Sequence, residues 1–110
     1  MSLERIIKAL QGFGLKRIEA EVYVYLAKKG PQKGRDLADA LNIRKQQLYH
    51  ILKKLQSSGI VTSNLGQPSV FSAKALEEVL NLYIKLNLEQ AEAIKENKQE
   101  LLTSWKSIDE

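Results

Sequence analysis

Apolar residues recur at helical spacing through the first half of the chain and predict four helices. Glycine and proline mark the breaks: Gly12 and Gly14 follow the first helix, Gly30-Pro31 the second and Gly59 the fourth. The expected helices span residues 2–10, 16–29, 34–41 and 44–57. Since only Asn42-Ile43 separates the short third helix from the fourth, the pattern predicts a helix-turn-helix.

The next segment changes from helical spacing to β character. Residues 60–63 are rich in β-branched side chains and residues 69–72 alternate, which predicts two short strands. The intervening residues 64–68 have the composition of a turn. The expected fold is therefore mainly α with a small β-hairpin: a winged helix-turn-helix domain over residues 1–73.

No glycine or proline interrupts residues 74–108, so the chain is expected to end in a long helix over residues 74–110. From Leu80 onward this helix can be written in heptads. The seam residues predicted to mediate dimerisation are Leu80, Ile84, Ala91, Ile94, Leu101, Trp105 and Ile108. Asn87 and Lys98 also fall on the seam, where they weaken it but can set its register. The helix could instead pack on its own domain, but a homodimer is the simpler way to remove the apolar stripe from water.

Charge is distributed unevenly along the chain. Residues 1–73 carry 12 basic and 5 acidic side chains, whereas residues 74–110 carry 5 basic and 8 acidic ones. No acidic residue lies between Asp39 and Glu77. A helix with cations and no anions on its exposed face suits a polyanion, so the helix over residues 44–57 is predicted to bind double-stranded DNA.

The exposed face of that helix has side chains that suit DNA bases. Glutamine can bond adenine through two atoms, and lysine can reach guanine. The expected contacts are Arg44, Lys45, Gln46, Gln47, His50, Lys53 and Lys54, with Tyr49 at the edge. Lys53 and Lys54 lie farther along the helix and are better placed for phosphates. The alternative is that these residues only form a solvated helix face.

Composition argues against several function classes. The chain has no cysteine and one histidine, which leaves no thiolate chemistry, metal cluster or catalytic relay, so we expect neither an enzyme nor a bound cofactor. The longest apolar run, residues 22–27, is too short to span a membrane. The first residues do not resemble a signal peptide, so a cytoplasmic location is expected.

Short motifs in this chain resemble the TrmB family of archaeal transcriptional regulators, whose members often sense sugars. The resemblance covers roughly residues 3–80 and implies a winged-helix DNA-binding domain. It rests on Phe13-Gly14-Leu15, Glu19-Ala20-Glu21-Val22-Tyr23, Gly30-Pro31, Asp36-Leu37-Ala38, Leu48-Tyr49, Gly59-Ile60-Val61, Gly66-Gln67-Pro68 and Phe71-Ser72-Ala73. Family members commonly carry a large effector-binding domain, and because this chain ends at Glu110, sugar sensing is not carried over.

Three helix starts depart from the family pattern. Where relatives often have threonine, serine or proline, this chain has Lys16, Lys33 and Arg44. A lost side-chain cap costs about 1 kcal/mol, and a cation there opposes the helix dipole. One hypothesis is that these three residues trade capping for contacts with DNA phosphates; the other is neutral drift, with neighbours such as Gln32 or Asn42 capping instead.

Phosphate contacts are also expected from Arg35 and from the wing. Residues 55–73 contain no charged side chain, so the wing can contribute only polar groups such as Asn64 and Gln67. The alternative is that the hairpin only covers the core.

Together these features predict a small dimeric transcriptional regulator. A protein-interaction module and a sequence-independent architectural DNA-binding protein are the alternatives. The operator, the direction of regulation and any small-molecule effector are left open by the sequence.

Overall fold

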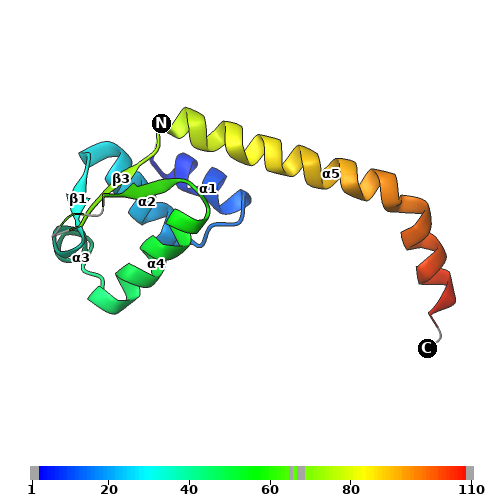
Figure 1. The fold of residues 1–110 in the computed structure, drawn as a ribbon, viewed down its shortest axis with the longest axis horizontal. Helices are drawn as coiled ribbons and strands as arrows, with labels where there is room; N and C mark the ends of the chain where they lie inside the picture. Colours follow the sequence, from blue (N-terminus) through cyan, green and yellow to red (C-terminus); the bar gives the residue numbers. More distant parts are fainter. Residues whose placement is uncertain (1–2, 65, 67–68, 109–110) are drawn as a thin grey trace. The chain divides into compact units, whose positions relative to one another are not determined.

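The computed structural model describes residues 3–64, 66 and 69–108 (Figure 1). Its helices are α1 (Leu3–Gly12), α2 (Arg17–Lys29), α3 (Gly34–Leu41), α4 (Lys45–Ser57) and α5 (Leu76–Ser107). Its strands are β1 (Gln32–Lys33), β2 (Val61–Ser63) and β3 (Val70–Ala73). The predicted mainly helical fold with a small β-hairpin and a long last helix is confirmed, and the ends of α1 to α4 agree with expectation to within two residues.

The sheet has one strand more than the sequence predicted. β2 and β3 pair antiparallel as the expected hairpin, with Ser63 opposite Phe71. β1 joins the other edge of β3, with Lys33 opposite Val70, which gives the strand order β1-β3-β2. A strand of two residues is too short to show a period of two, and only its distant partner defines it as a strand. The pairing brings the start of α3 next to the wing.

The core of this part of the chain collects the apolar stripes of α1 to α4 and the inner face of the hairpin. Helix α2 lies at its centre and contacts α1, α4 and β3. The side chains that are at most 1% exposed include Leu10, Val22, Tyr23, Leu26, Leu37, Leu48, Leu52, Leu55 and Ile60. Burying each such aliphatic side chain contributes about 1.5–3 kcal/mol, so these residues hold the helices in place.

The turn between α3 and α4 depends on one residue with a left-handed backbone. Asn42 has φ 54° and ψ 47°, a conformation that asparagine tolerates better than most residues. Its backbone N–H donates to the end of α3, and the N–H of Ile43 donates to Ala38 O at 3.0 Å. Ile43 is buried, so the turn directs α4 back across the core. Together with the hairpin, this completes a winged helix-turn-helix.

The chain divides into two compact units, one through Val79 and one from Leu80 on. The first turn of α5 belongs to the first unit, where Val79 is 1% exposed. Beyond it, every described residue from Ile84 to Ile108 is exposed, including Ile94, Leu101 and Trp105. Among the described residues, no helix has both the length and the apolar content needed to cross a membrane.

Candidate nucleic-acid interface

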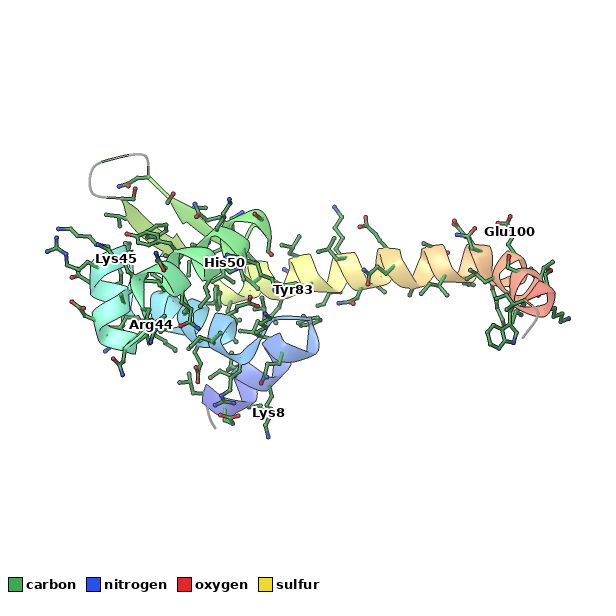
Figure 2. All side chains as sticks on the ribbon, turned by 90° about the horizontal axis from the view of Figure 1, so that it is seen from below. Lys8, Arg44, Lys45, His50, Tyr83 and Glu100 are labelled. Atoms are coloured by element: carbon green, nitrogen blue, oxygen red, sulfur yellow. The ribbon has the colours of Figure 1, made fainter. Side chains whose placement is uncertain are left out.

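Helix α4 has two clearly different faces. Leu48, Ile51, Leu52 and Leu55 are buried and hold the helix against the core. The predicted contact residues Lys45, Gln46, Gln47, His50 and Lys53 are all exposed, and Figure 2 labels Lys45 and His50 among them. No acidic residue occurs anywhere on α4. The structure thus gathers cations, amides and an imidazole on one solvent-facing surface, which we call the α4 outer face.

The three cations expected at helix starts are all N-cap residues in the structure. Lys16, Lys33 and Arg44 have extended backbones, and none of them makes a side-chain cap hydrogen bond. Lysine and arginine have only donors, so they cannot accept from the free N–H groups of the first turn. Asn42, one of the two expected substitute caps, closes the end of α3 instead.

Three of the predicted phosphate-binding and base-contacting cations surround one polar pocket. The pocket has a volume of about 220 Å³, and Lys33 comes from β1, Arg35 from α3 and Lys45 from α4. Its other lining residues are Gly34, Asp36, Tyr49 and Ser69. Three positive charges against the single negative charge of Asp36 give this pocket the electrostatics of an anion site.

Tyr49 has a packing role that the sequence did not reveal. Its ring lies edge-to-face against Phe71 of β3, with the ring centroids 6.1 Å apart. Its hydroxyl end lies so close to α3 that a Cβ on Gly34 would come within 2.8 Å of Tyr49 Cζ. Tyr49 is still 42% exposed, so it both joins α3, α4 and the wing and borders the α4 outer face.

Lys54 is already paired within the protein. Its Nζ lies 3.1 Å from both carboxylate oxygens of Glu19, a residue of α2 that is 4% exposed. Glu19 also accepts a 2.7 Å hydrogen bond from the N–H of Lys16, so one buried carboxylate caps α2 and ties it to α4. The charge of Lys54 is therefore less available to a phosphate than that of Lys53.

The wing uses its polar side chains mainly for its own turn. Asn64 Oδ1 accepts hydrogen bonds from the backbone N–H groups of Val70, at 2.9 Å, and Gly66, at 3.4 Å. Gln56 of α4 donates to Ser63 Oγ at 3.0 Å and holds the wing against α4. The prediction for Gln67 lies outside the described residues.

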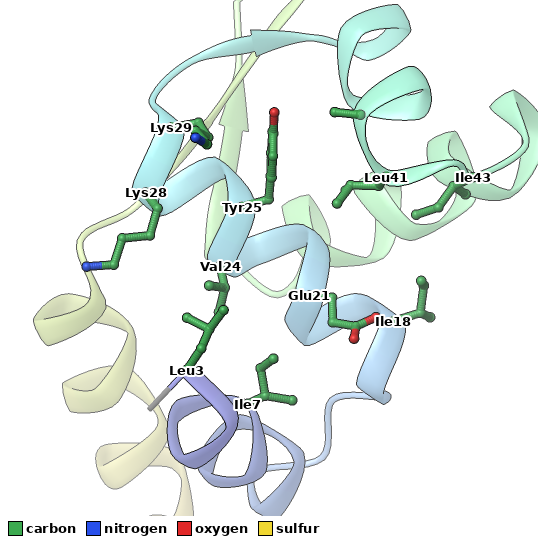
Figure 3. A pocket seen from close by; sticks show the side chains of 11 residues that line it. Leu3, Ile7, Ile18, Glu21, Val24, Tyr25, Lys28, Lys29, Leu41 and Ile43 are labelled. Carbon is green, nitrogen blue, oxygen red and sulfur yellow. The ribbon is translucent and has the colours of Figure 1, made fainter. Parts of the chain in front are cut away.

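A second, larger pocket lies apart from these residues (Figure 3). It has a volume of about 470 Å³ and opens among α1, α2, the end of α3 and the following turn. Its walls are mostly apolar and are formed by Leu3, Ile7, Ile18, Val24, Tyr25, Ala40, Leu41 and Ile43, with Glu21, Lys28 and Lys29 as its charged members. Glu21 is paired with Arg17 at 3.3 Å. Of the predicted DNA contacts that the structure describes, none lines this pocket.

Sequence analysis did not identify two residues that support the candidate interface, Glu19 and Gly34. Glu19 could have been found, because it shares a helical face with Val22, Tyr23 and Leu26, and an acid within an apolar stripe needs a buried partner. Gly34 gave no such signal: it lies at a helix start, where glycine is unremarkable, and only the packing of Tyr49 shows why a side chain does not fit.

Comparison with known proteins agrees with this geometry. The model of the family described as sugar-specific transcriptional regulator TrmB matches residues 10–77. The chain is 32% identical over 98 residues to the HTH-type sugar sensing transcriptional regulator TrmBL1 of Pyrococcus furiosus, and covers 29% of that protein. It is also 34% identical over 71 residues to the uncharacterised protein MJ1623 of Methanocaldococcus jannaschii, of which it covers 14%. The chain therefore spans less than a third of these curated relatives.

Solved structures show the same fold. The structure of TrmBL2, an archaeal chromatin protein, superposes with a TM-score of 0.75 and 28% identity over 93% of this chain and 42% of TrmBL2. The Zα domain of Carassius auratus PKZ, solved with Z-DNA, shares the fold at a TM-score of 0.51 and 21% identity over 53% of this chain and 94% of that domain. With the family model matching over most of its winged helix, this chain belongs to the TrmB family of transcriptional regulators.

Proposed function

We propose that this chain binds duplex DNA as the DNA-binding domain of a transcriptional regulator, with α4 as the recognition helix in the major groove. The α4 outer face carries the proposal: in a helix-turn-helix, the second helix is the one that enters the groove. Here that helix presents Lys45, Gln46, Gln47 and His50 to solvent from its N-terminal half, where base contacts are usually made. The family assignment supports the same interpretation.

The cations around this helix supply the sequence-independent part of the proposal. Lys33, Arg35 and Lys45 border one polar pocket, which suits a backbone phosphate. Lys16 and Arg44 stand at helix starts whose first-turn N–H groups have no cap from the N-cap side chain. Helix N-termini and cations both favour anions, so each of these positions can add a phosphate contact.

A second candidate is architectural binding without sequence preference. One observation favours it: the similar TrmBL2 is an archaeal chromatin protein. TrmBL1, by contrast, is described as a sugar-sensing regulator. The two functions differ in whether the amides of Gln46 and Gln47 discriminate bases.

Binding-site selection from a random duplex pool at two salt concentrations separates these functions. A regulator should enrich one motif, and Gln46→Ala and Gln47→Ala should each then lose about 1–3 kcal/mol of preference for it over a scrambled duplex, measured by fluorescence anisotropy. Enrichment of no motif, with tight salt-dependent binding, would favour the architectural function.

Lys8→Ala is the matched control, because it removes one exposed charge from α1, away from the α4 outer face (Figure 2). If Lys45→Ala and Gln46→Ala weaken DNA binding no more than Lys8→Ala does, α4 is not the recognition helix. Absence of any salt-dependent binding would instead support the protein-interaction module.

We also propose that the chain acts as a homodimer through α5. Ile84, Ile94, Leu101, Trp105 and Ile108 are exposed and recur in the expected heptad positions, which a second copy would cover, whereas Leu86, Leu88 and Leu102 are exposed outside those positions. The two recognition helices of the dimer would then bind two half-sites that are about 34–36 Å apart, or a multiple of that spacing. Sedimentation at tens of micromolar tests this, and a monomer there would contradict it.

A further inference from the structure

Two polar residues on the apolar stripe of α5 bear on the direction in which two copies would pair in the proposed homodimer. One heptad row of the stripe holds Ile84, Ala91, Lys98 and Trp105, and the other holds Leu80, Asn87, Ile94, Leu101 and Ile108. Most are apolar and exposed, with Ile94 62% and Trp105 70% exposed. This inference rests on the proposed homodimer and goes beyond it by fixing its geometry.

Parallel pairing would place identical residues opposite one another. Lys98 would then face Lys98 of the second copy across the seam, and Asn87 would face Asn87. Two ammonium groups brought together at a partly desolvated seam repel each other, and neither has an acidic partner in its own layer.

Antiparallel pairing places one heptad row opposite the other. In one register Asn87 faces Lys98 of the second copy, and the asparagine side-chain oxygen can accept a hydrogen bond from the ammonium group. The same register pairs Ile84 with Leu101, Ala91 with Ile94 and Leu80 with Trp105. A shift by one heptad in either direction would place Lys98 against Ile94 or Leu80, so of these three registers only this one gives Lys98 a polar partner. Ile108, at the end of its row, would lie opposite Glu77 of the second copy.

The charges along α5 favour the same direction. Residues 76–93 carry four glutamates and one lysine, whereas residues 94–107 carry three lysines and two glutamates. Most of these charges, including Lys85, Glu89 and Glu96, lie on the outer face of the heptad, so they act on the pair only at long range. Antiparallel pairing brings the acidic half of one helix alongside the basic half of the other, whereas parallel pairing brings like charges alongside each other. The helix dipoles also oppose each other favourably only in the antiparallel pair.

The surface of α5 provides a place for the partner's side chains. A hollow of about 440 Å³ is bordered by Ala93, Ile94, Asn97, Glu100, Leu101 and Ser104 (Figure 2 labels Glu100). In the antiparallel register, the layers of Ile94 and Leu101 receive Ala91 and Ile84 of the second copy. We propose that α5 is a self-recognition helix that forms an antiparallel pair with a second copy, in the register that matches Asn87 with Lys98.

The chain has no cysteine, so cross-linking can test this directly. Ile84→Cys and Leu101→Cys are prepared as separate proteins and oxidised alone and as a mixture. A disulfide needs Cα atoms within about 7 Å, so the antiparallel pair predicts a covalent dimer only in the mixture. Covalent dimers of each variant alone would show parallel pairing and overturn the proposal.

The matched control is the mixture of Glu89→Cys and Glu96→Cys. These residues lie at the same level in the proposed register but on the outer face of the heptad, so they should not cross-link. Cross-linking of this control as readily as of the Ile84→Cys and Leu101→Cys mixture would show random collision and overturn the proposal.

The polar layer has its own test. Lys98→Leu removes the only cation from the two rows, so the preference for the antiparallel register should weaken. Ile84→Cys combined with Lys98→Leu should then cross-link with itself at least several-fold more than Ile84→Cys alone. Lys85→Leu, on the outer face, should leave the pattern unchanged. No change with Lys98→Leu would overturn the role of Lys98.

Sedimentation and DNA binding of the unmodified chain separate the possible failures. A dimer that binds DNA but gives no covalent product in the mixture retains the proposed function and overturns only the pairing. A monomer that still binds DNA overturns both the homodimer and this pairing but leaves DNA reading by α4 intact.

Discussion

Lys54 and Glu19 form an ion pair that joins the candidate reading helix to the centre of the core. The ammonium nitrogen lies 3.1 Å from both carboxylate oxygens, and the carboxylate is 4% exposed whereas the lysine side chain is 45% exposed. Because an unpaired buried carboxylate is costly, this contact is a stability element on a surface otherwise suited to DNA.

Lys54→Ala should lower the free energy of unfolding by about 1–2 kcal/mol, a value reduced from the fully buried case because the lysine is half exposed. The reason is that, within the described part of the chain, Glu19 would keep only the Lys16 N–H as its hydrogen-bond donor. Urea denaturation measures the change. Lys53→Ala, one position away on α4 and exposed, is the control and should change stability by less than about 0.5 kcal/mol.

For DNA binding, the order of the two variants should be reversed: Lys53→Ala should have the larger effect and Lys54→Ala the smaller. Lys53→Ala should reduce the slope of log K against log salt by about 0.9, the value for one lost phosphate contact. Lys54→Ala should reduce it less, because Glu19 already neutralises that lysine. Anisotropy titrations at several salt concentrations measure the slopes, and an equal loss for both would show that the ion pair opens on DNA.

Gly34→Ala should destabilise the fold by about 1–2 kcal/mol, since the new Cβ would displace the ring of Tyr49. In a Tyr49→Leu background, the same change should be close to neutral, because alanine is the better helix former and the obstacle is gone. Chemical denaturation of the four proteins gives the coupling energy. A Gly34→Ala cost that persists without Tyr49 would refute the steric explanation.

Lys16→Thr and Lys33→Thr should each raise stability by up to about 1 kcal/mol, because they supply a hydroxyl acceptor and remove a cation from the positive end of a helix dipole. Lys16→Thr should gain most, since Glu19 already provides the reciprocal half of a capping box. Thermal denaturation measures the stability, and both variants should also show a flatter salt dependence of DNA binding than Lys8→Ala. An unchanged salt slope would mean that these cations do not contact phosphates.

Stability should fall between about pH 10 and pH 12 through Tyr23. Burial, and then the negative charge of Glu78, raise the pKa of Tyr23 to about 12 from its usual 10.0, and its hydroxyl donates to Lys74 O at 2.6 Å. In this window the unfolded state loses the phenolic proton while the folded state keeps it, so the unfolded state binds fewer protons and stability decreases as pH rises.

Tyr23→Phe isolates this effect. The variant should be about 1 kcal/mol less stable near neutral pH, because the hydrogen bond to Lys74 O is lost, and its stability should decline less steeply above pH 10. Parallel urea denaturation series of both proteins measure the difference. Identical slopes would show that Tyr23 does not titrate with a raised pKa.

Local periodicity is enough to place the helices of this protein along the chain. The stripe of Leu48, Ile51, Leu52 and Leu55 both predicted α4 and placed Gln46 and Lys53 on its other face, because a period of 3.6 residues relates burial to sequence position. The family motifs are equally local, and the family model confirmed the resemblance.

The contacts that those helices make depend on how the chain folds. β1 became a strand only through β3, and Lys54 became an internal partner only because α2 places Glu19 beneath it. Tyr49 became a packing residue only where Gly34 and Phe71 meet it. Each contact joins residues far apart in the chain, and its energy depends on distance and burial in space. The sequence therefore shows which helix faces are apolar and which are polar, whereas the fold shows which polar side chains stay exposed and which are held by internal partners.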